Sequence, residues 1–145
     1  MHNVLAEIGT EMAQFPSARH LASWASLCPG NNKTAGKNKS GKTRKGNRSL
    51  RAALTQRAWA AVRTKGTYFR AQCFRLARRR GKQRAIIAVC HSLLATIYAV
   101  LSDRLAYSEL GEDFYDRLNS DSLARYYVQQ LERLGHSVAL SAIAA

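Results

Sequence analysis

Residues 35–43, AGKNKSGKT, carry a glycine and lysine pattern that can hold phosphates. The pattern is G-x-x-x-x-G-K-[ST], and it is fitted here by Gly36, Gly41, Lys42 and Thr43. In a phosphate-binding loop, backbone N–H groups and the lysine hold the phosphates of a nucleotide, and the hydroxyl contacts Mg²⁺. The stretch is therefore either a nucleotide-binding loop or a basic, glycine-rich loop that fits the pattern by coincidence.

The flanking residues favour coincidence. A phosphate-binding loop lies between a buried strand and a helix, so that backbone donors and the helix dipole converge on the ligand. The preceding residues, CPGNNKTA, contain no apolar run, and Gly46 follows too closely for immediate helix entry. The chain also lacks the alternation of strands and helices that builds a parallel sheet. We therefore do not interpret this stretch as a nucleotide site.

The charges are segregated along the chain, which has a formal net charge of +14. Residues 12–102 hold 19 of the 23 basic residues and none of the nine acidic ones, whereas residues 103–145 are net acidic. Such a block is typical of a protein that binds a polyanion, and nucleic acid is the leading partner. An anionic membrane surface and a merely solubilising face are the alternatives.

Two clusters of basic residues are predicted to contact nucleic acid. Residues of this kind contact phosphates and position a duplex without determining its sequence. The first basic cluster comprises Lys33, Lys37, Lys39, Lys42, Arg44, Lys45, Arg48 and Arg51. The second basic cluster comprises Arg78, Arg79, Arg80, Lys82 and Arg84. The alternatives are a solvated charge run for the first cluster, and cations that stabilise a helix C-terminus for the second.

The cysteines and histidines indicate no metal site. The three cysteines, Cys28, Cys73 and Cys90, lie far apart, and the four histidines are scattered. The odd number of cysteines and the lack of a signal peptide favour reduced thiols in a cytosol.

Hydrophobic periodicity predicts that helices position these residues. Helices are expected over residues 3–14 with an interruption at Gly9, from Pro16 to Pro29, over 49–63 after an Asn47 or Ser49 cap, and over 67–80 before Gly81. Leu50, Leu54 and Trp59 are expected to face inward, and Trp59, Tyr68, Phe69 and Phe74 to be core residues.

The longest helix is expected over residues 85–101, AIIAVCHSLLATIYAVL, as the buried centre of the fold. Its length lies at the lower limit for a membrane span, so a basic peripheral membrane protein is a further alternative. Residues 31–47 show no hydrophobic period and are expected to form a loop. Residues 121–135 predict an amphipathic helix, and residues 136–143 a short strand or a frayed extension.

The expected fold is mainly α, a compact helical bundle with a long basic Gly/Lys-rich loop. We expect a core over residues 1–102 that carries the basic loop 30–47. An acidic C-terminal extension with one amphipathic helix is expected over residues 103–145.

The stretch FPSARHLASWASLCPGNNKTAGKNKSGKTRKGNRSLRAALTQRAWAA closely resembles the C-terminal transposase domain of a bacterial family of insertion-sequence transposases. This is the one-ten/one-sixteen/nine-oh-two family, whose members recombine DNA under guidance from a structured RNA. The resemblance continues through RRRGKQRAIIAVCHSLLATIYAVL and the YSELGEDFYDRL and RLGHSVAL segments, so it covers essentially the whole chain.

The resemblance implies DNA recombination by two parts. In the family, a RuvC-like domain supplies four acidic ligands for Mg²⁺, and the C-terminal domain supplies a serine that becomes covalently attached to DNA. The carboxylate tetrad has no counterpart here, so no cofactor is expected in this chain alone. The serine position, five residues after Pro29, is held by Thr34, whose extra methyl crowds attack on phosphorus. Thr34 is therefore expected to occupy the catalytic position and to react poorly, or to be an ordinary solvated loop residue.

The leading interpretation is a transposase C-terminal domain, a truncated remnant that binds DNA in the bacterial cytoplasm, near the nucleoid, and is inactive alone. The resemblance implies a guide RNA, full-length transposase or further copies of the chain as additional partners, and no membrane. The second basic cluster would then contact the other DNA strand or the guide RNA. The alternative is a non-catalytic nucleic-acid-binding module that interferes with or assists full-length transposase.

Overall fold

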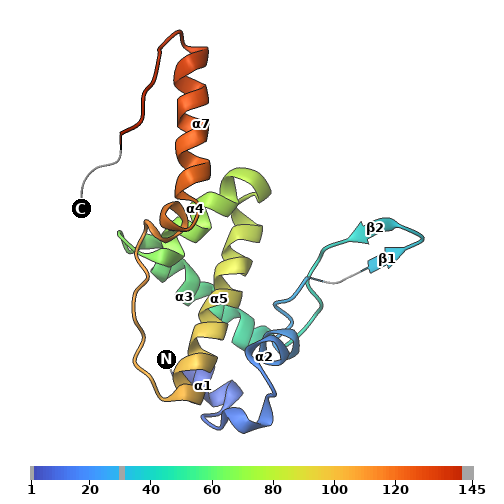
Figure 1. Cartoon of the computed structure of the whole chain (residues 1–145). Helices are drawn as coiled ribbons and strands as arrows, with labels where there is room; N and C mark the ends of the chain where they lie inside the picture. Colours follow the sequence, from blue (N-terminus) through green and yellow to red (C-terminus); the bar gives the residue numbers. More distant parts are fainter. Residues whose placement is uncertain (1, 30–31, 142–145) are drawn as a thin grey trace. The chain divides into compact units, whose positions relative to one another are not determined.

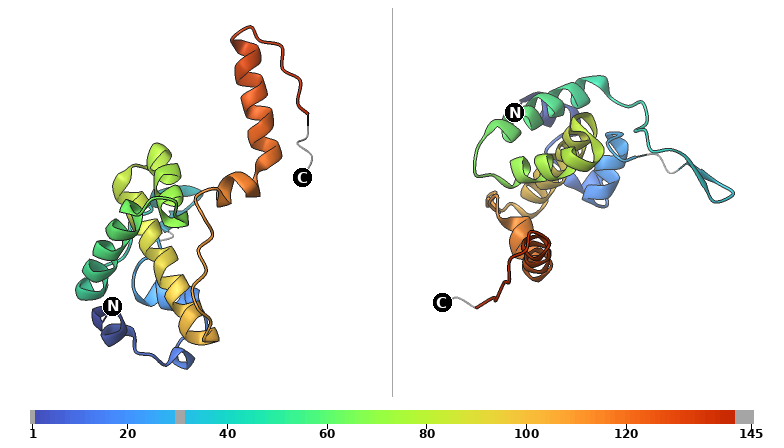
Figure 2. Two further views of the ribbon diagram at one scale, coloured as in Figure 1. Left: turned by 90° about the vertical axis from the view of Figure 1, so that its left-hand side faces the viewer. Right: turned by 90° about the horizontal axis from the view of Figure 1, so that it is seen from above.

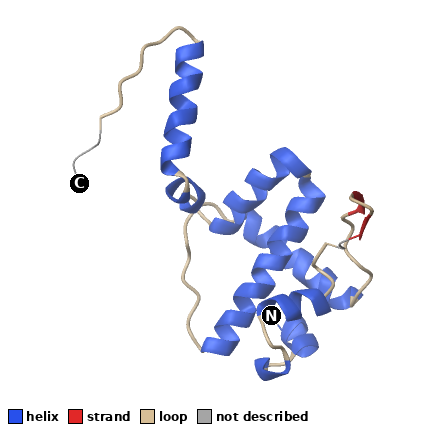
Figure 3. Cartoon of the chain, turned by 45° about the vertical axis from the view of Figure 1, so that its right-hand side comes forward, coloured by secondary structure: helices blue, strands red, loops and turns tan. Residues whose placement is uncertain are grey.

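The computed structural model describes residues 2–29 and 32–141. The chain forms two compact units, Met1–Glu112 and Asp113–Ala145. In chain order, unit 1 contains α1 (His2–Ile8), the 3-10 helix η1 (Met12–Gln14), α2 (Ala18–Trp24), β1 (Asn32–Thr34), β2 (Lys37–Ser40), α3 (Arg48–Arg63), α4 (Tyr68–Arg80) and α5 (Lys82–Asp103) (Figure 1). Unit 2 contains α6 (Phe114–Leu118) and α7 (Ser120–Arg133). The prediction of a mainly α fold is confirmed, and Figure 3 shows the short strands beside the helices.

Helix α5 lies at the centre of unit 1, where it packs against α2, η1, α3 and α4 (Figure 2). Its buried residues Val89, Cys90 and Leu94 join a core with Leu50 and Leu54 of α3. Two further contacts fix α5: the Gln72 amide donates to the Ser92 hydroxyl over 2.8 Å, and the Tyr98 hydroxyl donates to the Phe15 carbonyl over 3.0 Å. The predicted central position of this helix is confirmed.

Helix α5 is also long and apolar enough to cross a membrane, judged by length and composition alone. Less than a third of its apolar window is buried in unit 1. Core helices of soluble proteins meet the same criteria.

The ends of α3 and α4 follow from local hydrogen bonds. Asn47 caps α3, because its side-chain oxygen accepts from the Leu50 N–H at 3.1 Å. Thr67 caps α4 in the same way through the Arg70 N–H. Gly81 ends α4 with φ +83°, a left-handed conformation that favours glycine. These helix limits agree with the sequence predictions.

The interruption predicted at Gly9 is confirmed, whereas the second helix is shorter than predicted. Helix α1 ends at Ile8 because Gly9 turns the chain with φ +71°. Helix α2 begins only after Ser17, which caps it, so Pro16 does not lie in its first turn. It ends at Trp24, two residues before Ser26, which has φ +56°.

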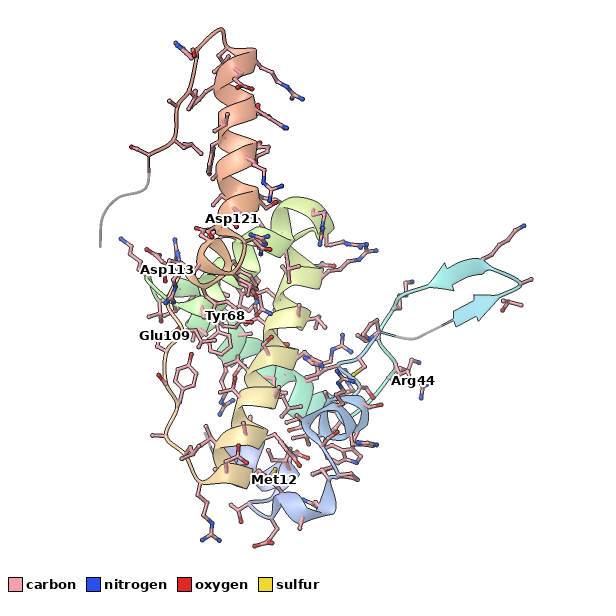
Figure 4. The ribbon with its side chains drawn as sticks, in the orientation of Figure 1. Met12, Arg44, Tyr68, Glu109, Asp113 and Asp121 are labelled. Atoms are coloured by element: carbon pink, nitrogen blue, oxygen red, sulfur yellow. The ribbon has the colours of Figure 1, made fainter. Side chains whose placement is uncertain are left out.

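The segment that follows α5 belongs to unit 1 as far as Glu112. The Glu109 carboxylate accepts hydrogen bonds from the Tyr68 N–H at 2.8 Å, the Gly111 N–H at 3.2 Å and the Tyr107 hydroxyl at 2.9 Å (Figure 4). The Tyr107 ring stacks on Phe69, with centroids 6.2 Å apart. Glu109 thus satisfies an N–H group in the first turn of α4 from a distant part of the sequence.

The described part of unit 2 contains no buried side chain. Helix α7 starts one residue before Asp121 and ends shortly before Gly135, as the predicted amphipathic helix does. Residues 136–141 have no regular structure, so the strand or helix extension predicted there is wrong for these residues, and residues 142–143 lie outside the described part. Their apolar residues are too few to cover a face in a unit without a core.

Candidate nucleic-acid interface

The centre of the first basic cluster is a β-hairpin with a two-residue turn. β1 and β2 pair antiparallel, with Thr34 opposite Lys37 and an irregularity between Asn32 and Lys33. The turn residues Ala35 and Gly36 both have positive φ, +48° and +77°, which is the geometry of the tight turns that match the twist of a hairpin. Figure 1 shows the hairpin standing away from the helices. The sequence predicted a loop here, because neither strand contains an apolar residue from which a period could be identified.

The base of the hairpin is fixed to the helices of unit 1. Pro29 and Thr43 form an isolated bridge that continues the antiparallel pairing. The Thr43 hydroxyl accepts from the Arg51 guanidinium at 2.9 Å, which ties the returning chain to α3. The Ser26 hydroxyl donates to the Lys45 carbonyl at 3.5 Å, a long contact.

The segment between the hairpin and α3 passes very close to the end of α2. A Cβ added to Gly46 would lie 2.4 Å from the Ser26 Oγ and 2.5 Å from the Ser26 Cβ, so a glycine is required at this crossing. The next residue, Asn47, caps α3 and donates from its amide to the Glu7 carboxylate of α1. Three helices therefore determine the path of this basic segment.

These contacts exclude a phosphate-binding loop for Gly36, Gly41, Lys42 and Thr43. Gly36 lies in the hairpin turn, and Thr43 lies at the hairpin base with its hydroxyl bonded to Arg51. The described strand that leads into the pattern, β1, has the polar sequence Asn-Lys-Thr, and α3 begins only at Arg48.

Most of the first basic cluster faces solvent. The exposed members with described side chains are Lys37, Lys42, Arg44, Lys45 and Arg48; Figure 4 labels Arg44. Arg51 is half-buried, and one of its five N–H donors is engaged by Thr43. The side chains of Lys33 and Lys39 lie outside the described part of the structure. The six described members, from Lys37 in β2 to Arg51 in α3, form a basic strip that follows the chain from the hairpin to the first turn of α3.

Thr34 is exposed at the end of β1, beside the hairpin turn. Residues directly opposite in an antiparallel pair have Cβ atoms roughly 5 Å apart, which places Lys37 next to Thr34. The hairpin sequence contains no aspartate, glutamate or histidine that could accept a proton from the Thr34 hydroxyl.

The second basic cluster lies at the corner between α4 and α5. Arg78, Arg79 and Arg80 form the last turn of α4, where cations favour the helix dipole, and all three are exposed. Lys82 and Arg84 form the first turn of α5, where cations oppose it. Stabilisation of a helix C-terminus, the alternative to nucleic-acid binding, therefore accounts for the three arginines of α4 and not for Lys82 and Arg84 of α5.

The predicted core aromatics are correct only in part. Phe69 is buried, whereas Trp59 is 43% exposed and Phe74 is 53% exposed, beneath the Arg70 guanidinium. Trp59 lies nine positions after Leu50, half a turn out of phase on a helix with 3.6 residues per turn, and Ala58 takes the core position instead. Trp24 of α2 is likewise half-exposed.

Cys73 and Cys90 act as core residues, whereas Cys28 is only partly buried. Burial raises the pKa of the Cys73 thiol. Burial also raises that of Cys90, although a hydrogen bond to Thr55 opposes the shift. Neutral, buried thiols are poor nucleophiles and poor metal ligands. Within residues 2–29 and 32–141, no three His, Cys, Asp or Glu side chains lie close enough to hold a metal ion.

Comparison with known protein families finds a match over the N-terminal half of the chain. The model described as the Transposase IS116/IS110/IS902 family covers residues 1–73, which include the hairpin, Thr34 and the whole first basic cluster. The second basic cluster lies beyond the matched residues. No curated protein and no solved structure matches the chain. Because the matched residues make up half of the chain, the chain belongs to the IS116/IS110/IS902 transposase family.

Proposed function

We propose that the first basic cluster binds the phosphate backbone of DNA during transposition and that Thr34 holds the position of the family's nucleophile. Membership of a transposase family gives the chain a role in DNA transposition. The observation that carries the proposal is that the matched residues build the exposed basic strip and its hairpin.

The charge pattern supports phosphate binding. No acid interrupts the sequence between Glu11 and Asp103, so a phosphate strand along the strip meets no carboxylate within that part of the sequence. If about six phosphates are neutralised, the logarithm of the affinity falls with the logarithm of salt concentration with a slope of roughly −5.

DNA binding is tested by fluorescence anisotropy with a labelled duplex over a range of salt concentrations. Replacing Arg44 and Lys45 with glutamine should reduce the steepness of the salt slope by about two, one for each lost phosphate contact. The matched control is Lys65→Gln, which changes an exposed lysine outside both basic clusters. Equal effects of the control and the double substitution would contradict a specific strip and favour non-specific charge attraction.

Thr34 can carry the covalent step only through its hydroxyl. Attack of the Thr34 Oγ1 on a DNA phosphorus forms a threonine–phosphate ester and releases a DNA hydroxyl, which takes up a proton as the Thr34 proton is lost to a base. That base is not on the hairpin, whereas Lys37, on the opposite strand, can hold the phosphate close to Thr34. The threonine methyl crowds the attack, so we expect a slow reaction.

Divalent metal ions are expected from a separate RuvC-like domain. Mg²⁺ prefers carboxylate oxygens, and the described residues offer no cluster of three possible ligands. The residues of this chain are therefore assigned only to DNA binding and to the covalent ester.

The chemical role of Thr34 is tested by supplying a RuvC-like domain, Mg²⁺, a donor–target DNA pair and guide RNA together with the chain. Thr34→Ser should increase the yield of the covalent protein–DNA adduct on a denaturing gel, and Thr34→Ala should abolish it with DNA affinity unchanged. An adduct formed by Thr34→Ala would remove Thr34 from the catalytic position. Strand exchange by the chain without the added domain would contradict its expected inactivity alone.

The second candidate function is a non-catalytic DNA-binding module that acts on full-length transposase. It is favoured by the threonine at the serine position and by the lack of a general base on the hairpin. Such a module would inhibit or assist full-length transposase equally well with Thr34, serine or alanine. We expect either activity in the bacterial cytoplasm, where the DNA is located.

A further inference from the structure

A cleft lies between α1, η1 and α2, outside the basic strip. It has a volume of about 420 Å³, within the roughly 300–1,000 Å³ of small-molecule sites. Its walls are formed by Glu7, Ile8, Gly9, Gln14, Phe15 and Trp24.

The walls combine an aromatic surface with a carboxylate. Trp24 is half-exposed and packs at a tilt against Phe15, with ring centroids 5.6 Å apart, so its ring is supported on one side. The Gln14 amide donates to the Ile8 carbonyl at 2.7 Å and holds the turn after α1. The Glu7 carboxylate accepts from the Asn47 amide, which uses only part of its capacity of about four lone pairs.

Two contacts connect this cleft directly to the basic strip. Glu7 in the cleft is bonded to Asn47, the residue immediately before exposed Arg48. Ser26, two residues after Trp24, touches the strip at Lys45 and Gly46. The wall of the cleft and the basic strip are therefore adjacent at Glu7 and near Trp24.

We propose that the cleft receives an unpaired base of a single nucleic-acid strand whose phosphates lie on the basic strip, an inference that rests on the proposed function. The base stacks on the Trp24 ring, as bases do on exposed aromatic side chains in single-strand-binding proteins. The Glu7 carboxylate accepts from an exocyclic amino group, so adenine, cytosine and guanine bind better than thymine, which has none.

The chain contains two tryptophans, which allows a direct spectroscopic test. Trp59→Phe leaves Trp24 as the only indole, and stacking of a base should quench its fluorescence. The ligands are a short oligodeoxycytidine, its ribose counterpart, an abasic strand of equal length and a duplex. Quenching by either cytidine strand, without quenching by the abasic strand or the duplex, is the expected result, and the stronger of the two quenchers identifies DNA or RNA as the source of the base.

Affinity measurements supply a second readout. Trp24→Ala should weaken oligodeoxycytidine binding about tenfold, within the range for loss of one stacked base, and leave abasic-strand binding unchanged. Trp59→Ala is the matched control and should bind both strands normally, and Glu7→Gln should reduce the preference for oligodeoxycytidine over oligothymidine.

Different results identify which proposal fails. If the cytidine strands bind while Trp24 fluorescence is unchanged, or if the abasic strand quenches it equally, the base site is wrong and strip binding stands. If no nucleic acid binds, the proposed function and this inference both fail.

Discussion

The crossing of Gly46 over Ser26 gives a sharp test of how the basic strip is held. Gly46→Ala would place a Cβ 2.5 Å from the Ser26 Cβ, whereas carbon atoms pack at about 3.5–4.0 Å. The segment must therefore move by about 1 Å or more away from the end of α2. No positive φ is recorded at Gly46, so the cost is steric.

Two estimates limit the size of this effect. Inserting a methyl into a packed site typically costs about 1–3 kcal/mol. Local detachment of the segment would instead break the Ser26–Lys45 and Arg51–Thr43 hydrogen bonds, at about 1 kcal/mol each. The cheaper route sets the loss, so we expect the free energy of unfolding to fall by about 1–2 kcal/mol.

The assay is urea unfolding of a double-mutant cycle. Ser26→Gly removes both atoms that clash with the added Cβ and should restore the stability lost in Gly46→Ala. Ser26→Gly alone also relieves backbone strain at φ +56°, so its own effect on stability is subtracted in the cycle. Ser26→Ala should not restore it, because its Cβ stays in place. Gly41→Ala is the control, since a Cβ there meets nothing within 4 Å. A stable Gly46→Ala variant, or equal losses in the wild-type and Ser26→Gly backgrounds, would refute the packing argument.

Three further predictions concern the hairpin, the start of α3 and the cap of α4. Ala35→Asn should slow amide exchange across the hairpin, because asparagine tolerates φ +48° better than alanine and Asn-Gly favours this turn; unchanged exchange would contradict the turn geometry. Asn47→Ala should cost about 1–2 kcal/mol in urea unfolding through loss of the α3 cap and of the Glu7 contact, and wild-type stability would contradict both roles. Burial would raise the pKa of Glu109, but the hydrogen bonds to its carboxylate outweigh burial and lower the pKa. The contribution of the carboxylate to stability is therefore present above the ordinary pKa of glutamate and is lost as pH falls through the lowered value. Burial and the Glu109 hydrogen bond raise the pKa of Tyr107 to about 12, so the contribution of the Tyr107 hydroxyl to stability is present below the ordinary pKa of tyrosine and is lost as pH rises toward 12. Glu109→Gln should weaken both pH dependences of stability in thermal unfolding. Unchanged curves of stability against pH would refute the coupling of the two groups.

The sequence predicted best those features that depend on neighbouring residues. Asn47 and Thr67 cap helices and Gly81 ends one, because their side chains or conformations act within a single turn. The most apolar segment became the central helix, because burying apolar side chains removes them from water, and five of its residues are buried.

Features that depend on contacts between distant residues could not be predicted from local sequence patterns. Helical spacing could place Trp24 on a face of α2, but whether another element covers that face depends on the path of α1 and η1. The contact of Glu109 with Tyr68 joins residues far apart in sequence and leaves no local pattern. The hairpin was missed for a different reason: its polar strands carry no period, and only the Ala35-Gly36 pair between two short runs indicated a turn.

The absence of apolar residues from the hairpin strands also bears on how Thr34 is positioned. An isolated two-stranded hairpin is marginally stable in water, and this one is held through backbone pairing and the contacts at its base. Its lysines repel one another until phosphates neutralise them, so the proposed DNA binding would stabilise the same hairpin that carries Thr34. The covalent step and phosphate binding would then be coupled, because the hydroxyl is held in place most firmly when DNA is bound.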